Sequence, residues 1–117
     1  MIRRKWIIVP IDKHAERALD YDKASSEELI ELGLSEEELD FLYQEGIIDL
    51  INQHGNALVD DFEEDEITDT QSLRKVTAAL VQQAESLRGS SKYRLIQDLI
   101  TLFSEALNRD TGVYFFF

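Results

Sequence analysis

Hydrophobic positions at the two ends of the chain have the pattern of β-strands. A short apolar run rich in β-branched residues covers positions 6–9. Near the other end a turn signal at 110–112 precedes five apolar residues, of which three would share one strand face: Val113, Phe115 and Phe117. Aromatic residues at this density would promote aggregation if they were exposed. We therefore expect both strands to be docked, against each other or in one small sheet.

Between the two ends, apolar residues recur at the helical spacings of three and four. A helix is predicted over 35–53, because Ser35 and Glu38 fit a capping box ahead of an apolar stripe that ends at Ile51. Gly46 lies inside this helix and marks a bend or a close packing point.

Two further helices are predicted in the second half of the chain. One begins after Asp69 or Thr70 and ends at Gly89, and the next is capped by the pair at 90–91. Because the link between them is short, they are expected to form an antiparallel helical hairpin.

Three shorter segments have weaker patterns. A short helix is predicted over 14–19, and a second helix is predicted to start at Ser25 or Ser26 and to end at Gly33. Positions 60–68 have no helical stripe, which predicts a loop or a short edge element. Alternatively, the stretch at 57–59 or Phe62 contributes an additional strand. The chain as a whole predicts a mainly helical α+β domain, with about four helices and a small sheet formed by the N- and C-terminal strands.

The length and the amino-acid composition of the chain are those of one globular domain, over residues 1–117. A chain of this length can bury a hydrophobic core without disulfide or metal cross-links. No Cys is available for disulfides or thiolate chemistry. The basic start and its short apolar run lack the features of a secretory signal, and no stretch is long enough to span a membrane. We expect a cytoplasmic protein.

The charge is segregated along the chain. From Ala24 to Leu73, fifty residues contain sixteen Asp and Glu but no Lys or Arg, whereas the rest of the chain has a net charge of +4. Five bases near the two C-terminal helices are candidate neutralisers: Arg74, Lys75, Arg88, Lys92 and Arg94. Such a segment is suited to attracting a positive partner, and the net charge of −12 disfavours binding to nucleic acid or to anionic membranes.

Catalytic and metal-binding patterns are weak. His14 and His54 have no motif around them, and no glycine-rich phosphate loop is present. The carboxylates over 61–66 alternate somewhat as in a calcium loop, but the turn glycine and the bidentate Glu at its proper distance are missing. We expect no enzyme activity, no cofactor and no metal.

The acidic residues are the best candidates for a binding site. Carboxylates such as Glu27 and Glu28 lie in the first turns of predicted helices, where they complement the helix dipole. The carboxylates over 60–66 lie at no predicted helix start, and they surround the apolar Phe62. An interface needs both electrostatic steering and an apolar anchor. The predicted partner-binding residues are Asp60, Asp61, Phe62, Glu63, Glu64, Asp65 and Glu66, with Glu37, Asp40 and Tyr43 from the preceding helix.

In its size, its Cys-free acidic composition and its helical body closed by an aromatic strand over 112–117, the chain resembles the immunity proteins of bacterial contact-dependent growth inhibition systems. The resemblance implies a cognate toxin domain as partner, a cytoplasmic location and no catalysis. A basic, nuclease-type toxin would have its active cleft occluded by the carboxylates. The alternative is an acidic DNA mimic or adaptor that occupies a nucleic-acid-binding protein. The oligomeric state is left open.

Overall fold

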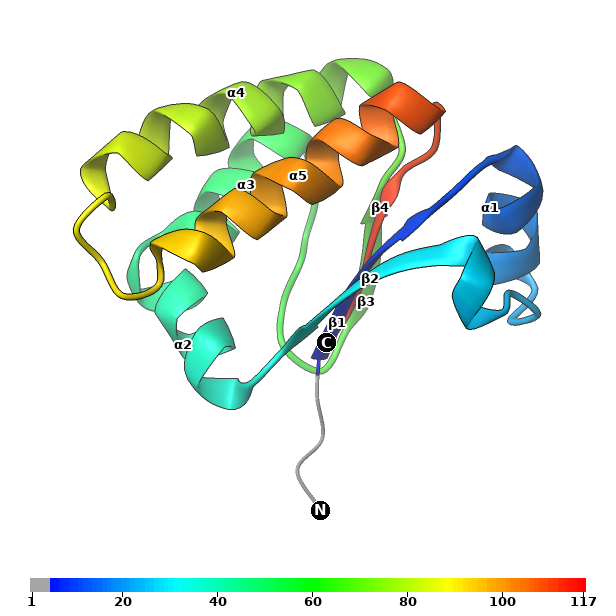
Figure 1. The fold of residues 1–117 in the computed structure, drawn as a ribbon, viewed down its shortest axis with the longest axis horizontal. Helices are drawn as coiled ribbons and strands as arrows, with labels where there is room; N and C mark the ends of the chain where they lie inside the picture. Colours follow the sequence, from blue (N-terminus) through cyan, green and yellow to red (C-terminus); the bar gives the residue numbers. More distant parts are fainter. Residues whose placement is uncertain (1–4) are drawn as a thin grey trace.

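The computed structural model describes residues 5–117, and the basic start of the chain at positions 1–4 lies outside them. Its centre is an antiparallel sheet with the strand order β2-β1-β4-β3 (Figure 1). The strands are β1 (Lys5–Pro10), β2 (Leu29–Leu34), β3 (Glu64–Ile67) and β4 (Val113–Phe116). The helices are α1 (Lys13–Asp20), α2 (Glu36–Gln44), α3 (Ile47–Gly55), α4 (Thr70–Ser86) and α5 (Tyr93–Arg109), with a 3₁₀ turn over Ser26–Glu28. The predicted α+β class is confirmed.

The two terminal strands pair with each other at the centre of the sheet, as predicted. Trp6 lies opposite Phe116, and Ile8 lies opposite Tyr114. The alternate residues of the C-terminal strand point to the helical side and are buried, and the Phe115 ring lies 6.4 Å from that of Phe103 in α5. Helices α4 and α5 form the expected antiparallel hairpin on this side, whereas α1 lies on the other face (Figure 1).

The helix predicted from Ser25 or Ser26 to Gly33 is wrong. The Ser25 N–H does bond to the Glu28 carboxylate, at 3.2 Å, but the helical conformation lasts for one 3₁₀ turn. The chain then continues as β2, which pairs with β1 along its whole length. The apolar residues at 30, 32 and 34 also have the period of a strand, and pairing with β1 outweighs the local cap.

The helix predicted over 35–53 is divided in two. Ser35 caps α2 as expected, because its Oγ accepts from the Glu38 N–H at 3.1 Å. At Gly46 the backbone has a φ of 72°, so the chain turns and α3 begins in a new direction. No atom lies within 4 Å of the position that a Cβ would take there, so the glycine serves backbone conformation and not close packing.

Two helix starts in the second half were predicted with different success. Asp69 caps α4, and its Oδ2 accepts from the Ser72 N–H at 2.9 Å. Helix α5 begins later than predicted, at Tyr93, because 90–91 lie in the turn and Lys92 occupies the cap position. Helix α4 ends at Ser86, before the predicted stop at Gly89.

The segment predicted as a loop or edge element contains the edge strand β3, so the sheet has two strands beyond the terminal pair. The alternative strands at 57–59 and Phe62 are wrong. The Asn52 side chain holds this connection by bonding both backbone groups of Val59, at 2.7 and 2.9 Å. These two bonds take the place of strand pairing at Val59.

Candidate protein-binding surface

The acidic segment, residues 60–66, leads from the connection after α3 into the edge strand β3. It turns close to the C-terminal end of the chain (Figure 1), where the Phe117 N–H donates to the Glu63 carbonyl at 3.1 Å. Two of its residues, Asp61 and Asp65, are half-buried, and five are exposed: Asp60, Phe62, Glu63, Glu64 and Glu66. Most of its carboxylates therefore face solvent.

Lys5 anchors the turn of the acidic segment. Its side chain is 8% exposed, and its ammonium nitrogen lies 3.0 Å from Asp61 Oδ1 and donates to the Phe117 carbonyl. The same nitrogen lies 4.3 Å from the centroid of the Phe62 ring. One buried cation thus satisfies a carboxylate and a carbonyl and contacts an aromatic face, which fixes the turn relative to both terminal strands.

Phe62 has an uncommon combination of backbone conformation and exposure. Its φ is 63°, in the left-handed region that a bulky residue rarely adopts, and its N–H donates to Asp61 Oδ1 at 3.0 Å. The residue is nevertheless 83% exposed. Strained conformations that a structure holds in place are concentrated at binding sites, so the presentation of this ring to solvent favours a contact role.

Leu58 is a second exposed apolar residue in the same connection, at 82% exposure. Its N–H donates to Asp65 Oδ2 at 2.7 Å, while Asp65 Oδ1 accepts from the Glu66 N–H at 2.8 Å. The half-buried carboxylate of Asp65 therefore holds Leu58 beside β3. Sequence reasoning missed Leu58 because a single leucine in a loop gives no local signal of its exposure.

Tyr43 joins α2 to the acidic segment, as the predicted set requires. Its hydroxyl donates to Asp60 Oδ1 at 2.9 Å, and the same oxygen accepts from the Asp61 N–H at 2.8 Å. Burial, together with the hydrogen bond to Asp60, raises the pKa of Tyr43 to about 12. The phenol therefore remains a neutral donor and orients Asp60 at neutral pH.

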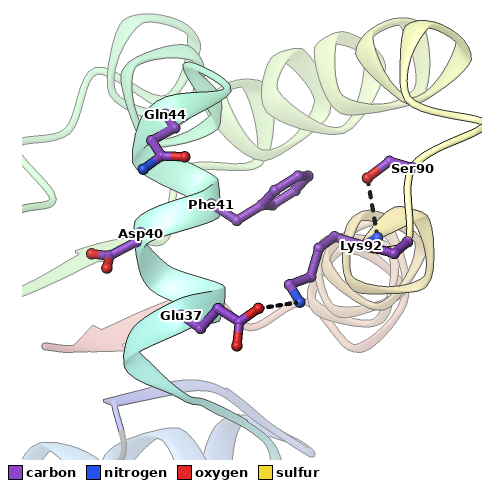
Figure 2. A pocket seen from close by; sticks show the side chains of 7 residues that line it. Glu37, Asp40, Phe41, Gln44, Ser90 and Lys92 are labelled. Carbon is purple, nitrogen blue, oxygen red and sulfur yellow. Dashed lines mark hydrogen bonds and ion pairs between the residues drawn. The ribbon is translucent and has the colours of Figure 1, made fainter.

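Glu37 and Asp40 precede Tyr43 in α2 and line a groove of about 330 Å³ between this helix and the turn before α5. Figure 2 shows that Glu37 points to Lys92, and their charged atoms lie 3.1 Å apart. Asp40 points away from Lys92 (Figure 2). Along α2 it lies three residues, about one helical turn, before Tyr43. Asp40 can thus extend the acidic surface, whereas Glu37 is paired at the groove.

The carboxylates of β3 divide between the two faces of the sheet. Glu64 and Glu66 lie opposite Phe116 and Tyr114 on the face away from α5. Although Glu66 is exposed overall, partial desolvation of its carboxylate and, secondarily, the charge of Asp20 raise its pKa above the usual value. Among residues 5–117, no Lys or Arg forms an ion pair with Glu64 or Glu66 on this face.

Of the five predicted neutralisers, Lys92 pairs with Glu37 of the acidic stretch at 24–73. Arg88, just after α4, pairs with Glu85, and Arg94 pairs with Asp98 within α5. Lys5, which was not among the candidates, holds Asp61. The contact joins the first described residue to position 61, and no local pattern in the sequence links the two.

The chain matches no family model, no curated protein and no solved structure. Within residues 5–117, no three His, Asp or Glu side chains form a group that could hold a metal ion. The described helices include none with the length and apolarity needed to cross a membrane. His14 and His54 are both exposed.

Proposed function

We propose that the chain is an immunity protein, which binds a cognate toxin domain with a basic surface and blocks its active cleft. In this proposal the protein acts in the bacterial cytoplasm and catalyses no reaction. The observation that carries the proposal is Phe62: an aromatic ring 83% exposed, held in a left-handed conformation, within a segment of six carboxylates.

The two components of this surface have separate physical roles. The exposed carboxylates attract a basic partner over a distance set by ionic strength and so raise the association rate. Leu58 and Phe62 can be desolvated on contact, and buried apolar anchors slow dissociation. Lys5 and Tyr43 keep the turn and Asp60 in place, so little ordering remains to be done when the partner binds.

Growth rescue tests the function. The chain is co-expressed with the toxic C-terminal domain of a large secreted protein encoded by the neighbouring gene, and growth is compared with cells that express the toxin alone. We expect rescue from this toxin and not from unrelated toxins. Failure to rescue, together with displacement of DNA from several unrelated binders, would favour the DNA-mimic alternative.

Affinity and rate measurements with the same toxin domain test the surface. The changes Leu58→Ala and Phe62→Ala should each weaken binding by about 30-fold or more, because an anchor contributes about 2 kcal/mol or more. The matched control is Val81→Ala, which truncates an exposed apolar residue of α4. Equal losses in the control would mean that the acidic segment is not the binding surface.

The charges are tested by a triple variant, D60N/E63Q/E64Q, which leaves Asp61 on Lys5. The association rate should fall more than the dissociation rate rises, and the salt dependence of binding should decrease. A control with the same charge change carries E27Q/E45Q/D49N. An unchanged salt dependence in the first variant would contradict the assignment of the steering charges.

A further inference from the structure

The outer face of the sheet, away from α5, is covered along part of its length. Where α1 packs on it, Ile8 and Tyr114 are buried. Beyond α1, Trp6 is 38% exposed and its cross-strand partner Phe116 is partly exposed. An aromatic pair at the centre of a sheet is therefore open to solvent.

Carboxylates border this aromatic pair. Glu31 of β2 projects on one side, and Glu64 and Glu66 of β3 project on the other. Among the described residues, the outward positions of the four strands include no Lys or Arg. A hollow of about 240 Å³ on the β3 side is lined by Glu64, Asp65, Glu66, Tyr114 and Phe116.

Helix α1 adds negative charge beside Tyr114, which lines the hollow. Glu16 accepts a hydrogen bond from the Tyr114 hydroxyl at 2.9 Å, and the charges of Glu16 and Asp20 both raise the pKa of Glu66. Lys13 of the same helix lies 3.5 Å from Glu16 and 4.0 Å from Asp110, so its charge is shared between these two carboxylates. The hollow thus combines an aromatic floor with carboxylates, Glu64 and Glu66, that form no ion pair with any of residues 5–117.

We propose that this outer face binds an arginine-bearing extended segment of the partner, with a guanidinium on the Phe116 ring and forked onto Glu64 and Glu66. Charge complementarity selects a basic occupant. Arginine is favoured over lysine because its planar group stacks on aromatic faces and donates to two carboxylates at once. The inference rests on the proposed function, since it names the side chain by which a basic partner is recognised.

The turn of the acidic segment contains the same combination within the chain. There the Lys5 ammonium contacts both the Phe62 ring and the Asp61 carboxylate. The outer face presents a ring and carboxylates in a similar way, and within the described part of the chain no cation lies on them.

Trp6 is the chain's one tryptophan, so its fluorescence reports directly on this face. The probe is a hexa-arginine peptide, titrated into the full chain, with hexa-lysine for comparison. We expect a saturable change in Trp6 emission and tighter binding of hexa-arginine. The E64Q/E66Q variant should bind the peptide about tenfold more weakly, as expected for the loss of two exposed charge contacts.

Two variants control for general charge and for folding. The E45Q/D49N variant removes the same charge from the α2–α3 region and should bind as the wild type does. Phe116→Leu keeps an apolar side chain but loses the ring, and should weaken hexa-arginine binding while circular dichroism shows an unchanged fold.

Equal weakening in E64Q/E66Q and E45Q/D49N would overturn the proposal, because it would show general charge attraction. Equal affinity for the two peptides would overturn the choice of arginine. A change in Trp6 emission with protein concentration alone, accompanied by a dimer in light scattering, would show that a second copy covers the face. Toxin rescue by the wild-type chain separates the two proposals: arginine-selective peptide binding by a chain that rescues cells from no toxin would leave the arginine site standing without the immunity function.

Discussion

The ammonium nitrogen of Lys5 lies 3.0 Å from the carboxylate of Asp61, and this contact ties the first described strand to the acidic segment. Lys5 is buried and also donates to the Phe117 carbonyl. The neighbouring Phe62 ring lies against the same ammonium. Lys5 therefore holds the turn of the candidate surface against both ends of the described chain.

Replacement of Lys5 by methionine should lower the free energy of unfolding by about 1–3 kcal/mol, because a buried carbonyl loses its donor. The matched control is Lys13→Met, which removes an exposed lysine whose ion pair with Glu16 is weak. The control should cost less than about 0.5 kcal/mol. Urea denaturation of both variants measures the difference, and equal midpoints would contradict the anchoring role of Lys5.

The terminal strands and the α4–α5 hairpin could be predicted because their signals are local and consistent. Asp69 and the stripe behind it specify one helix, and the alternation after Gly112 specifies one strand face. At positions 29–34, local capping favoured a helix while period-two alternation favoured a strand. Pairing with β1 decided between them, and such pairing cannot be read from a local window.

The carboxylates of the candidate surface could be predicted from the sequence, but the contacts that hold them in place could not. Clustered charge and one aromatic residue are visible in the sequence at 60–66. The buried cation beneath them, the exposure of Leu58 and the open Trp6–Phe116 pair depend on contacts between distant segments. Such contacts follow from the sheet order, which the sequence pattern did not specify.

Two substitutions at Phe62 test its backbone conformation separately from its ring. Both Phe62→Gly and Phe62→Val remove the ring and its contact with Lys5. Glycine adopts a positive φ without strain, whereas a β-branched side chain is strongly disfavoured there. The glycine variant should therefore be more stable than the valine variant by about 1–2 kcal/mol. Thermal or urea denaturation measures this difference, and a valine variant of equal stability would show that position 62 is not held at a positive φ.

Glu66 should make the stability depend on pH in a defined direction. Burial and nearby carboxylates raise its pKa above 4.5, so the folded chain binds the proton more tightly than the unfolded chain. The free energy of unfolding that this group contributes therefore falls as the pH rises from about 4.5 through the folded value. Glu66→Gln should melt at a higher temperature than the wild type at pH 7, and the difference should disappear near pH 4.

Asp69 supplies a control of opposite sign for the same measurement. Hydrogen bonds from Ser72 lower its pKa, so its contribution to stability is present at neutral pH and is lost as the pH falls through the folded value. Asp69→Ala should melt lower than the wild type at pH 7, and the gap should narrow in acid. If the difference in melting temperature from the wild type changed with pH in the same direction for the Glu66 and Asp69 variants, the assignment of the two pKa shifts would be contradicted.

The break between α2 and α3 depends on Gly46 having a backbone conformation that other residues rarely adopt. With a φ of 72° and open space around the Cβ position, Gly46→Ala creates no clash but incurs the left-handed penalty of about 1–2 kcal/mol. Gly89 also has open space, and its φ lies outside the left-handed region, so Gly89→Ala should leave stability unchanged or raise it by up to about 1 kcal/mol. Urea denaturation of the two variants gives the comparison. If Gly46→Ala were as stable as Gly89→Ala, the two helices would not need a glycine to separate, and the continuous helix expected from the apolar stripe would become the better description.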